Sequence, residues 1–103
     1  MISGGLNVYP KEVESVLDGL AGVAESAVVG VADPDLGESV TAAVVAEPGV
    51  ELDTEQLRVA AREQLAGYKV PRRIEIVDEL PRNAMGKVEK NTLRSLLSTE
   101  DSR

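Results

Sequence analysis

The sequence predicts an α+β domain: a small mixed or antiparallel sheet of about three strands packed with about three helices. Segments with apolar residues at helical spacing alternate with short β-branched runs, and Gly, Pro and Asp clusters separate them. Helices and strands of mixed order around one small sheet are typical of the α+β class. The chain of 103 residues fits one domain, because domains commonly contain roughly 100–150 residues.

The first helix is predicted over residues 10–20. Pro10 suits a first helical turn, and Glu12 and Glu14 favour the positive end of the helix dipole, which is the only role we expect for these two acids. Apolar residues recur at helical spacing and define the buried face, which we expect to include Tyr9: Tyr9, Val13, Val16, Leu17 and Leu20.

Two strands are predicted next, over residues 26–31 and 39–45, as an antiparallel pair. The segment 33–37 between them has the composition of a turn. Asp33 and Asp35 in that turn could suggest a metal site, but the further oxygen ligands of a calcium loop are absent from it. We therefore interpret both acids as turn residues and expect no metal.

A second helix is predicted to begin after Asp53 and to run to about residue 66. Asp53 with Gln56 three positions later is a capping-box pattern, in which side chains bond the free N–H groups of the first turn. Residues 67–71 are predicted to be a linker.

The last third of the chain is predicted to contain a strand over 73–77, a loop over 80–87 and a short final helix that carries Leu93, Leu96 and Leu97. We expect the domain to end at residue 97 and residues 98–103 to be a disordered tail.

Composition excludes several classes of function. With no Cys and no His, the chain has no disulfide framework, no thiolate metal site, no imidazole base and no Ser-His-Asp triad. Its two aromatic residues make stacking on nucleic-acid bases improbable as a function. No apolar run approaches the roughly 18 residues of a membrane helix and no leader peptide is apparent, so we expect a cytoplasmic location.

The net charge of −7 is unevenly distributed. Residues 1–57 contain one basic and eleven acidic side chains, whereas residues 58–103 contain ten basic and seven acidic ones. The second half could bind a small anion such as a nucleotide phosphate; alternatively, both halves are solvated surfaces that keep the domain soluble.

One lysine, Lys87, is placed where it could bind an anion. It follows Gly86 in the predicted loop, and a loop can present a lysine ammonium to a phosphate or carboxylate oxygen. On its own this pattern is far more often that of an ordinary exposed lysine. The Ser3-Gly4-Gly5 segment is not a phosphate loop, because no Gly-Lys-Ser/Thr follows it and no strand precedes it.

Four motifs in a fixed order resemble those of one family. They are residues 3–14 (SGGLNVYPKEVE), residues 27–38 (AVVGV with Asp33 and Gly37-Glu38), residues 68–71 (YKVP) and residues 80–88 (LPRNAMGKV). Residues 1–97 resemble the small C-terminal domain of the acyl-adenylate-forming superfamily, which includes acyl-CoA synthetases, adenylation domains and luciferases. The first and last motifs are most similar to those of acyl-CoA synthetases, and among these to the malonyl-CoA synthetase-like group.

The resemblance implies a domain that is inactive alone. In the family a large N-terminal domain, which nothing in this sequence matches, binds ATP, Mg²⁺ and the carboxylic acid, and a hinge precedes the position of Met1. The lysine at the position of Lys87 enters the active site for adenylation, where an ammonium stabilises charge on the reacting oxygens. After a rotation, the loop at Ser3, Gly4 and Gly5 lines the channel for the pantetheine arm of CoA.

Three further basic residues, Lys69, Arg72 and Arg73, could contact the phosphates of CoA, or could simply form an exposed basic loop. Two alternatives to the catalytic role of the chain stay open. A protein lysine acetyltransferase of the GCN5 type could recognise the last motif and acetylate Lys87, which would neutralise its charge. The chain could also be a free-standing anion-binding module.

Overall fold

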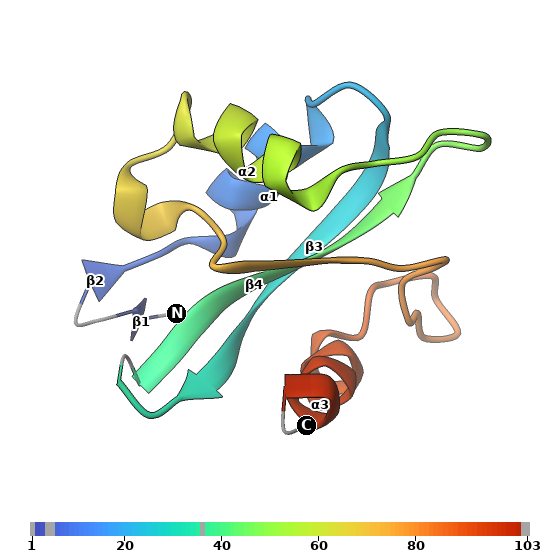
Figure 1. The fold of residues 1–103 in the computed structure, drawn as a ribbon. Coiled ribbons are helices and arrows are strands. Elements are labelled where there is room, and N and C mark those ends of the chain that lie inside the picture. Colours follow the sequence, from blue (N-terminus) through green and yellow to red (C-terminus); the bar gives the residue numbers. More distant parts are fainter. Residues whose placement is uncertain (1, 4–5, 36, 102–103) are drawn as a thin grey trace.

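The computed structural model describes residues 2–3, 6–35 and 37–101 (Figure 1). In chain order these residues form β1 (Ile2–Ser3), β2 (Leu6–Asn7), α1 (Pro10–Asp18), β3 (Val23–Asp33), β4 (Gly37–Ala46), α2 (Thr54–Arg62), a 3₁₀ helix (Gly67–Lys69), β5 (Arg73–Ile76) and α3 (Lys90–Asp101).

One mixed sheet organises the fold. Strands β3 and β4 form a long antiparallel hairpin that pairs Val23 with Ala46 at one end and Asp33 with Gly37 at the other. Strand β5 runs parallel to β4, and the short β1 joins the Gly37 end of β4 and pairs with β2. The predicted α+β class and the antiparallel pair are confirmed; the pair is longer than predicted, and the short β1–β2 pair was not predicted.

Helices cover both faces of the sheet. Helices α1 and α2 lie on one face and α3 lies on the other (Figure 1). Alternate residues of β4 therefore enter two separate cores: Val44 packs with α1 and α2, and Ala43 packs with α3. Burial on both faces explains why β3 and β4 are continuous apolar runs rather than alternating ones.

The helix ends differ from the predicted ones. Helix α2 stops at Arg62 and continues only as a turn in which Gln64 and Leu65 donate to the carbonyl of Ala61, so it is shorter than predicted. Helix α1 ends at Asp18. Helix α3 spans Lys90–Asp101 and carries the predicted Leu93, Leu96 and Leu97, while the domain end at residue 97 stays a prediction.

The expectation that Tyr9 packs on the buried face of α1 was wrong. Tyr9 is the N-cap residue with an extended backbone (φ −101°), and its side chain is 62% exposed. Helical spacing does not apply to a residue that precedes the first turn. Val13 and Leu17, inside the helix, are fully buried as predicted.

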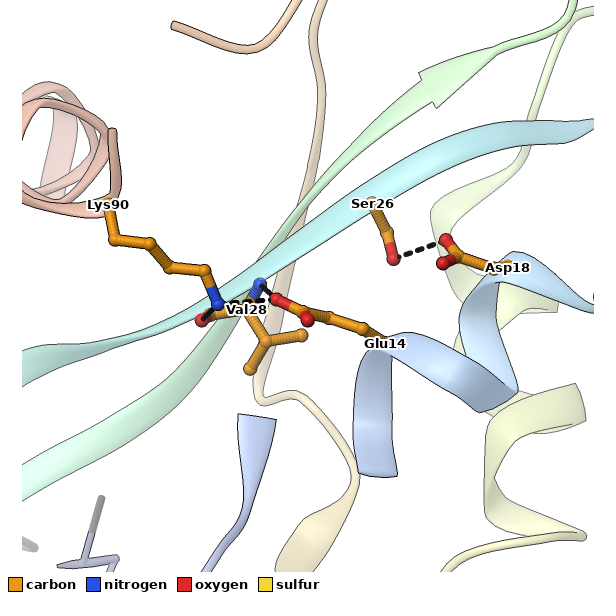
Figure 2. Close-up of polar contacts among 5 residues, drawn as sticks. All are labelled: Glu14, Asp18, Ser26, Val28 and Lys90. Atoms are coloured by element: carbon orange, nitrogen blue, oxygen red, sulfur yellow. Dashed lines mark hydrogen bonds and ion pairs between the residues drawn. The ribbon is translucent and has the colours of Figure 1, made fainter. Parts of the chain in front are cut away.

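Side chains from two helices cover the outer edge of β3 (Figure 2). The N–H of Val28 donates to Glu14 Oε2 at 2.8 Å, and the carbonyl of Val28 accepts from Lys90 Nζ at 3.0 Å. Lys90 also pairs with Glu14 at 2.5 Å, and Arg94 donates to the carbonyl of Gly30. These contacts satisfy backbone groups of an edge strand and fix the start of α3 three residues after Lys87. Glu14 thus has a role beyond the helix start.

Candidate functional site

Residues 81–89 form a hairpin-like connection between β5 and α3, which we call the Lys87 loop. Its two arms meet in an antiparallel bridge between Arg82 and Val88, and Glu89 N donates to the carbonyl of Pro81 at 2.8 Å. Leu80, immediately before the loop, is buried in the core beneath α3. The loop is therefore attached to the domain at its base, and its tip is exposed.

Asn83 organises the tip of the Lys87 loop. Its Oδ1 accepts hydrogen bonds from the N–H groups of Met85 and Lys87 at 2.9 and 3.0 Å, and its carbonyl accepts from Gly86 N at 2.9 Å. Gly86 has φ of +83°, which a residue without a Cβ adopts without strain. Asn and Gly at these positions make the tight turn that places Lys87 beside the apex.

Arg82 connects the tip to the sheet. Its guanidinium donates to the carbonyl of Gly86 at 2.8 Å and forms an ion pair with Glu25 of β3. A planar guanidinium has several donors in a fixed arrangement, so one side chain can bond a carbonyl and a carboxylate at once.

The ammonium of Lys87 is free to bind an anion. Lys87 is exposed, and its side chain has no hydrogen bond or ion pair with any residue in 2–3, 6–35 or 37–101. Lys69 and Lys90, by contrast, are paired with Glu12 and Glu14. A cation without an internal partner on a hydrogen-bonded loop can neutralise oxygens that another molecule or domain presents.

The Ser3 segment lies away from the Lys87 loop. Ser3 is in β1 and pairs with Gly37, whereas Arg82 contacts Glu25 at the opposite end of the β3–β4 hairpin, so the two sites are on different sides of the molecule (Figure 1). Gly4 and Gly5, which we expected to line a pantetheine channel with Ser3, are outside the described residues.

The three other basic candidates differ in availability. Lys69 Nζ lies 2.9 and 3.1 Å from the two oxygens of Glu12, whose hydrogen bond raises the pKa of the Lys69 ammonium. Arg73 pairs with Glu75 and donates to the carbonyl of Leu97, which ties β5 to α3. Arg72 is exposed, and within the described part of the chain its side chain has no such partner. Their contact with CoA stays a prediction.

A surface hollow lies apart from the candidate site residues described above. A hollow of about 420 Å³ opens between the end of α1 and the start of α2, lined by Leu20, Val50, Leu52 and neighbouring residues. In the described ranges no group of three or more His, Cys, Asp or Glu side chains could hold a metal ion. Nor does that part of the chain contain a helix long and apolar enough to cross a membrane.

Arg82, Asn83 and Glu25 were not predicted from the sequence as functional residues. The Asn-x-x-Gly spacing of residues 83–86 is a turn signal that could have identified Asn83. Nothing local indicates the contact between Glu25 and Arg82, because 57 positions separate them along the chain.

Comparison with known proteins assigns a family. A model described as the AMP-binding enzyme C-terminal domain matches residues 12–87. A 3-[(3aS,4S,7aS)-7a-methyl-1,5-dioxo-octahydro-1H-inden-4-yl]propanoyl:CoA ligase of Rhodococcus jostii (strain RHA1) is 57% identical, over 90% of this chain and 18% of its own length. A feruloyl-CoA synthase of Amycolatopsis sp. is 47% identical, over 91% of this chain and 19% of its own length.

A solved structure gives the same result. The ATP-bound MatB of Rhodopseudomonas palustris superposes with a TM-score of 0.92 and 50% identity, over 95% of this chain and 20% of that protein. The chain thus spans about a fifth of the length of the relatives it matches. These relatives give no support to the acetyltransferase alternative, which stays a prediction, as does the free-standing anion-binding module.

Proposed function

Because the chain belongs to the AMP-binding enzyme C-terminal domain family, we propose that it is the C-terminal domain of an AMP-forming acyl-CoA synthetase and supplies that enzyme's adenylation lysine. One observation carries the proposal. Lys87 alone combines an exposed ammonium, no partner within the described residues, and a loop whose backbone is fixed by its own hydrogen bonds.

The proposed first reaction joins a carboxylic acid to ATP. A carboxylate oxygen attacks the α-phosphorus, the bond to the bridging oxygen breaks, pyrophosphate leaves and an acyl-adenylate forms. Negative charge on the reacting oxygens is greatest as these bonds change, so an ammonium at their position lowers the barrier. ATP and the acid are held by the N-terminal domain, the partner that this proposal requires, and Mg²⁺ is also bound there.

The proposed second reaction transfers the acyl group to CoA. The sulfur of CoA attacks the acyl carbon, the thiol proton leaves and AMP departs. Ser3, Gly4 and Gly5 would line the pantetheine channel, and Arg72, with a free guanidinium, is the best placed of the three basic candidates to meet a CoA phosphate. The opposite locations of Ser3 and Lys87 support a rotation of the domain between the two reactions.

The acid that is activated stays open. Relatives named for an octahydroindenyl propanoyl group and for a feruloyl group match this chain over nearly the same length. The similarity alone therefore assigns no acid to this chain, and membership of the malonyl-CoA synthetase-like group remains a prediction that rests on the sequence motifs.

Lys87→Ala in the full-length enzyme that contains this domain tests the proposal. Adenylation is measured by ATP–pyrophosphate exchange with the most active acid from a panel of aliphatic, aromatic and dicarboxylic acids. Thioester formation is measured separately, from the synthetic acyl-adenylate of that acid and CoA. We expect exchange to fall by about 100-fold or more, the usual loss for one charge-stabilising donor, while thioester formation is retained.

Lys11→Ala is the matched control. Lys11 is also an exposed lysine without a partner in the described residues, but it lies on α1. The control should retain both reactions. If Lys87→Ala also retains both, Lys87 is not the adenylation lysine and the proposed function fails.

A further inference from the structure

We propose that Arg82 is a positioning residue for adenylation: its guanidinium fixes the peptide group that precedes Lys87, and Glu25 fixes the guanidinium. This inference rests on the proposed function of Lys87. It concerns a contact between β3 and the Lys87 loop that neither the motifs nor the relatives assign.

The peptide group between Gly86 and Lys87 is held on both sides. Its carbonyl oxygen, on Gly86, accepts from Arg82 at 2.8 Å, and its N–H, on Lys87, donates to Asn83 Oδ1 at 3.0 Å. The next carbonyl, on Lys87, accepts from Asn83 N at 2.9 Å. Because these bonds restrict the torsions on either side of the Lys87 Cα, they set the direction in which its side chain leaves the loop.

Because residue 86 is a glycine, hydrogen bonds are needed to fix the backbone of the Lys87 loop there. Gly86 has φ of +83° and no atom within 4 Å of the position of a Cβ, so packing does not determine its conformation. Glycine reaches both signs of φ with similar ease. Asn83 bonds the N–H groups of Gly86 and Lys87, and Arg82 bonds the Gly86 carbonyl between them. Without the Arg82 hydrogen bond this carbonyl loses its restraint, and the ammonium of Lys87 would be held less closely in its direction toward the substrate.

A bulge in β3 supplies the other half of the contact. The β3–β4 register shifts between Val23 and Glu25, and such a bulge re-aims the side chains on either side of it. Val23 packs into the core beneath α1 and α2, whereas Ala27 and Val29 face α3. Glu25, two residues before Ala27, therefore lies on the α3 side of the sheet, where its carboxylate accepts from Arg82.

The ion pair between Arg82 and Glu25 has an electrostatic effect in addition to attaching the Lys87 loop to β3. Glu25 neutralises the charge of Arg82, so Lys87 remains the free cation of the loop for a reacting carboxylate and phosphate. Both side chains are partly exposed, at 41% for Arg82 and 36% for Glu25, so the contribution of the pair to folding is small compared with its effect on orientation.

The test uses the full-length enzyme with Arg82→Ala, Arg82→Lys, Glu25→Gln and the double variant Glu25→Gln/Arg82→Ala. For Arg82→Ala we expect kcat of pyrophosphate exchange to fall roughly 10- to 100-fold, as displacement of a reacting group by about an ångström does, with little change in KM for ATP. Thioester formation from synthetic acyl-adenylate should be unchanged. Arg82→Lys, which can restore a single hydrogen bond, should recover part of the loss.

The double variant should lose no more activity than Arg82→Ala, because Glu25 acts through Arg82. Arg58→Ala, which removes an arginine paired with Glu55 on α2, is the matched control and should leave exchange unchanged. A purely structural role of Arg82 would lower the melting temperature and affect both half-reactions equally. That pattern, or wild-type exchange in both Arg82 variants, would overturn the inference.

Failure of the inference is separable from failure of the proposed function. If Lys87→Ala abolishes exchange while Arg82→Ala and Arg82→Lys retain it, the adenylation lysine is correct and the positioning role is wrong. If Lys87→Ala retains exchange, both are wrong.

Discussion

Replacement of Glu14 by alanine is expected to destabilise this domain more than the loss of any exposed ion pair. Glu14 Oε2 accepts from the N–H of Val28 at 2.8 Å and from Lys90 Nζ at 2.5 Å, and the Glu14 side chain is only 18% exposed. In the alanine variant Lys90 keeps the carbonyl of Val28 as an acceptor, at 3.0 Å. The N–H of Val28, a residue that is 0% exposed, loses its partner.

The size of the destabilisation follows from two losses: the acceptor of the Val28 N–H, and the ion pair between Glu14 and Lys90. An unsatisfied buried N–H costs roughly 1–3 kcal/mol, and a partly exposed ion pair contributes roughly 0–1 kcal/mol. We therefore expect the free energy of unfolding to fall by about 2 kcal/mol. In a domain of this size about 1 kcal/mol corresponds to roughly 4–8 °C, so the melting temperature should fall by about 8–16 °C.

Urea unfolding of the chain, followed by far-ultraviolet circular dichroism, measures the change. Glu12→Ala is the control. Glu12 also lies on α1 and pairs with a lysine, Lys69, but its side chain is 45% exposed and bonds no backbone N–H in the described residues. Glu14→Gln keeps an acceptor for Val28 and should lie between the wild type and Glu14→Ala. If Glu14→Ala and Glu12→Ala have the same midpoint and slope, the edge contacts do not stabilise the domain and the reasoning is refuted.

Three further predictions concern other elements. Asp53 Oδ1 accepts from two N–H groups at the start of α2, so Asp53→Ala should lower the free energy of unfolding by about 1 kcal/mol, measured in urea. Gly86 and Gly49 both have positive φ and open space for a Cβ; each alanine variant should cost roughly 1–2 kcal/mol, but only Gly86→Ala should slow pyrophosphate exchange in the full-length enzyme. The hydrogen bond to Glu12 raises the pKa of Lys69 above 10.5. The stabilisation of the folded domain by this pair is therefore complete below pH 10.5 and is lost as the pH rises through the raised pKa. Unfolding midpoints from pH 8 to 11.5 should therefore decline more steeply in the wild type than in Glu12→Gln; parallel curves would contradict the assignment.

Local patterns predicted the elements because the causes are local. The spacing of Val13 and Leu17 placed α1, and both side chains are fully buried. The acid at Asp53 predicted a helix start, and its carboxylate accepts from the N–H groups of Glu55 and Gln56. Each of these features is fixed within a few residues, so the sequence displays it directly.

The parallel alignment of β5 on β4 and the edge contacts of β3 have no such local cause. Thr41 pairs with Arg73 only because α2 returns the chain to the far side of β4. The partner of Glu14 is Lys90, 76 positions away. A carboxylate near the start of a helix has the same sequence signature whether it bonds solvent or a distant backbone N–H, so the second role of Glu14 was not predictable.

The charge asymmetry of the sequence does not by itself identify a cation that is available to an anion. The acidic first half and the basic second half were interpreted as two solvated surfaces or as a basic face for an anion. In the structure three acids of the first half instead pair with bases of the second: Glu12 with Lys69, Glu14 with Lys90, and Glu25 with Arg82. These pairs neutralise three cations of the second half, and two of the pairs, Glu14–Lys90 and Glu25–Arg82, hold the elements on either side of Lys87. Lys87, by contrast, is exposed and has no partner among the described residues. That difference in pairing, which the net charge does not reveal, is why we propose Lys87 as the cation that meets the substrate.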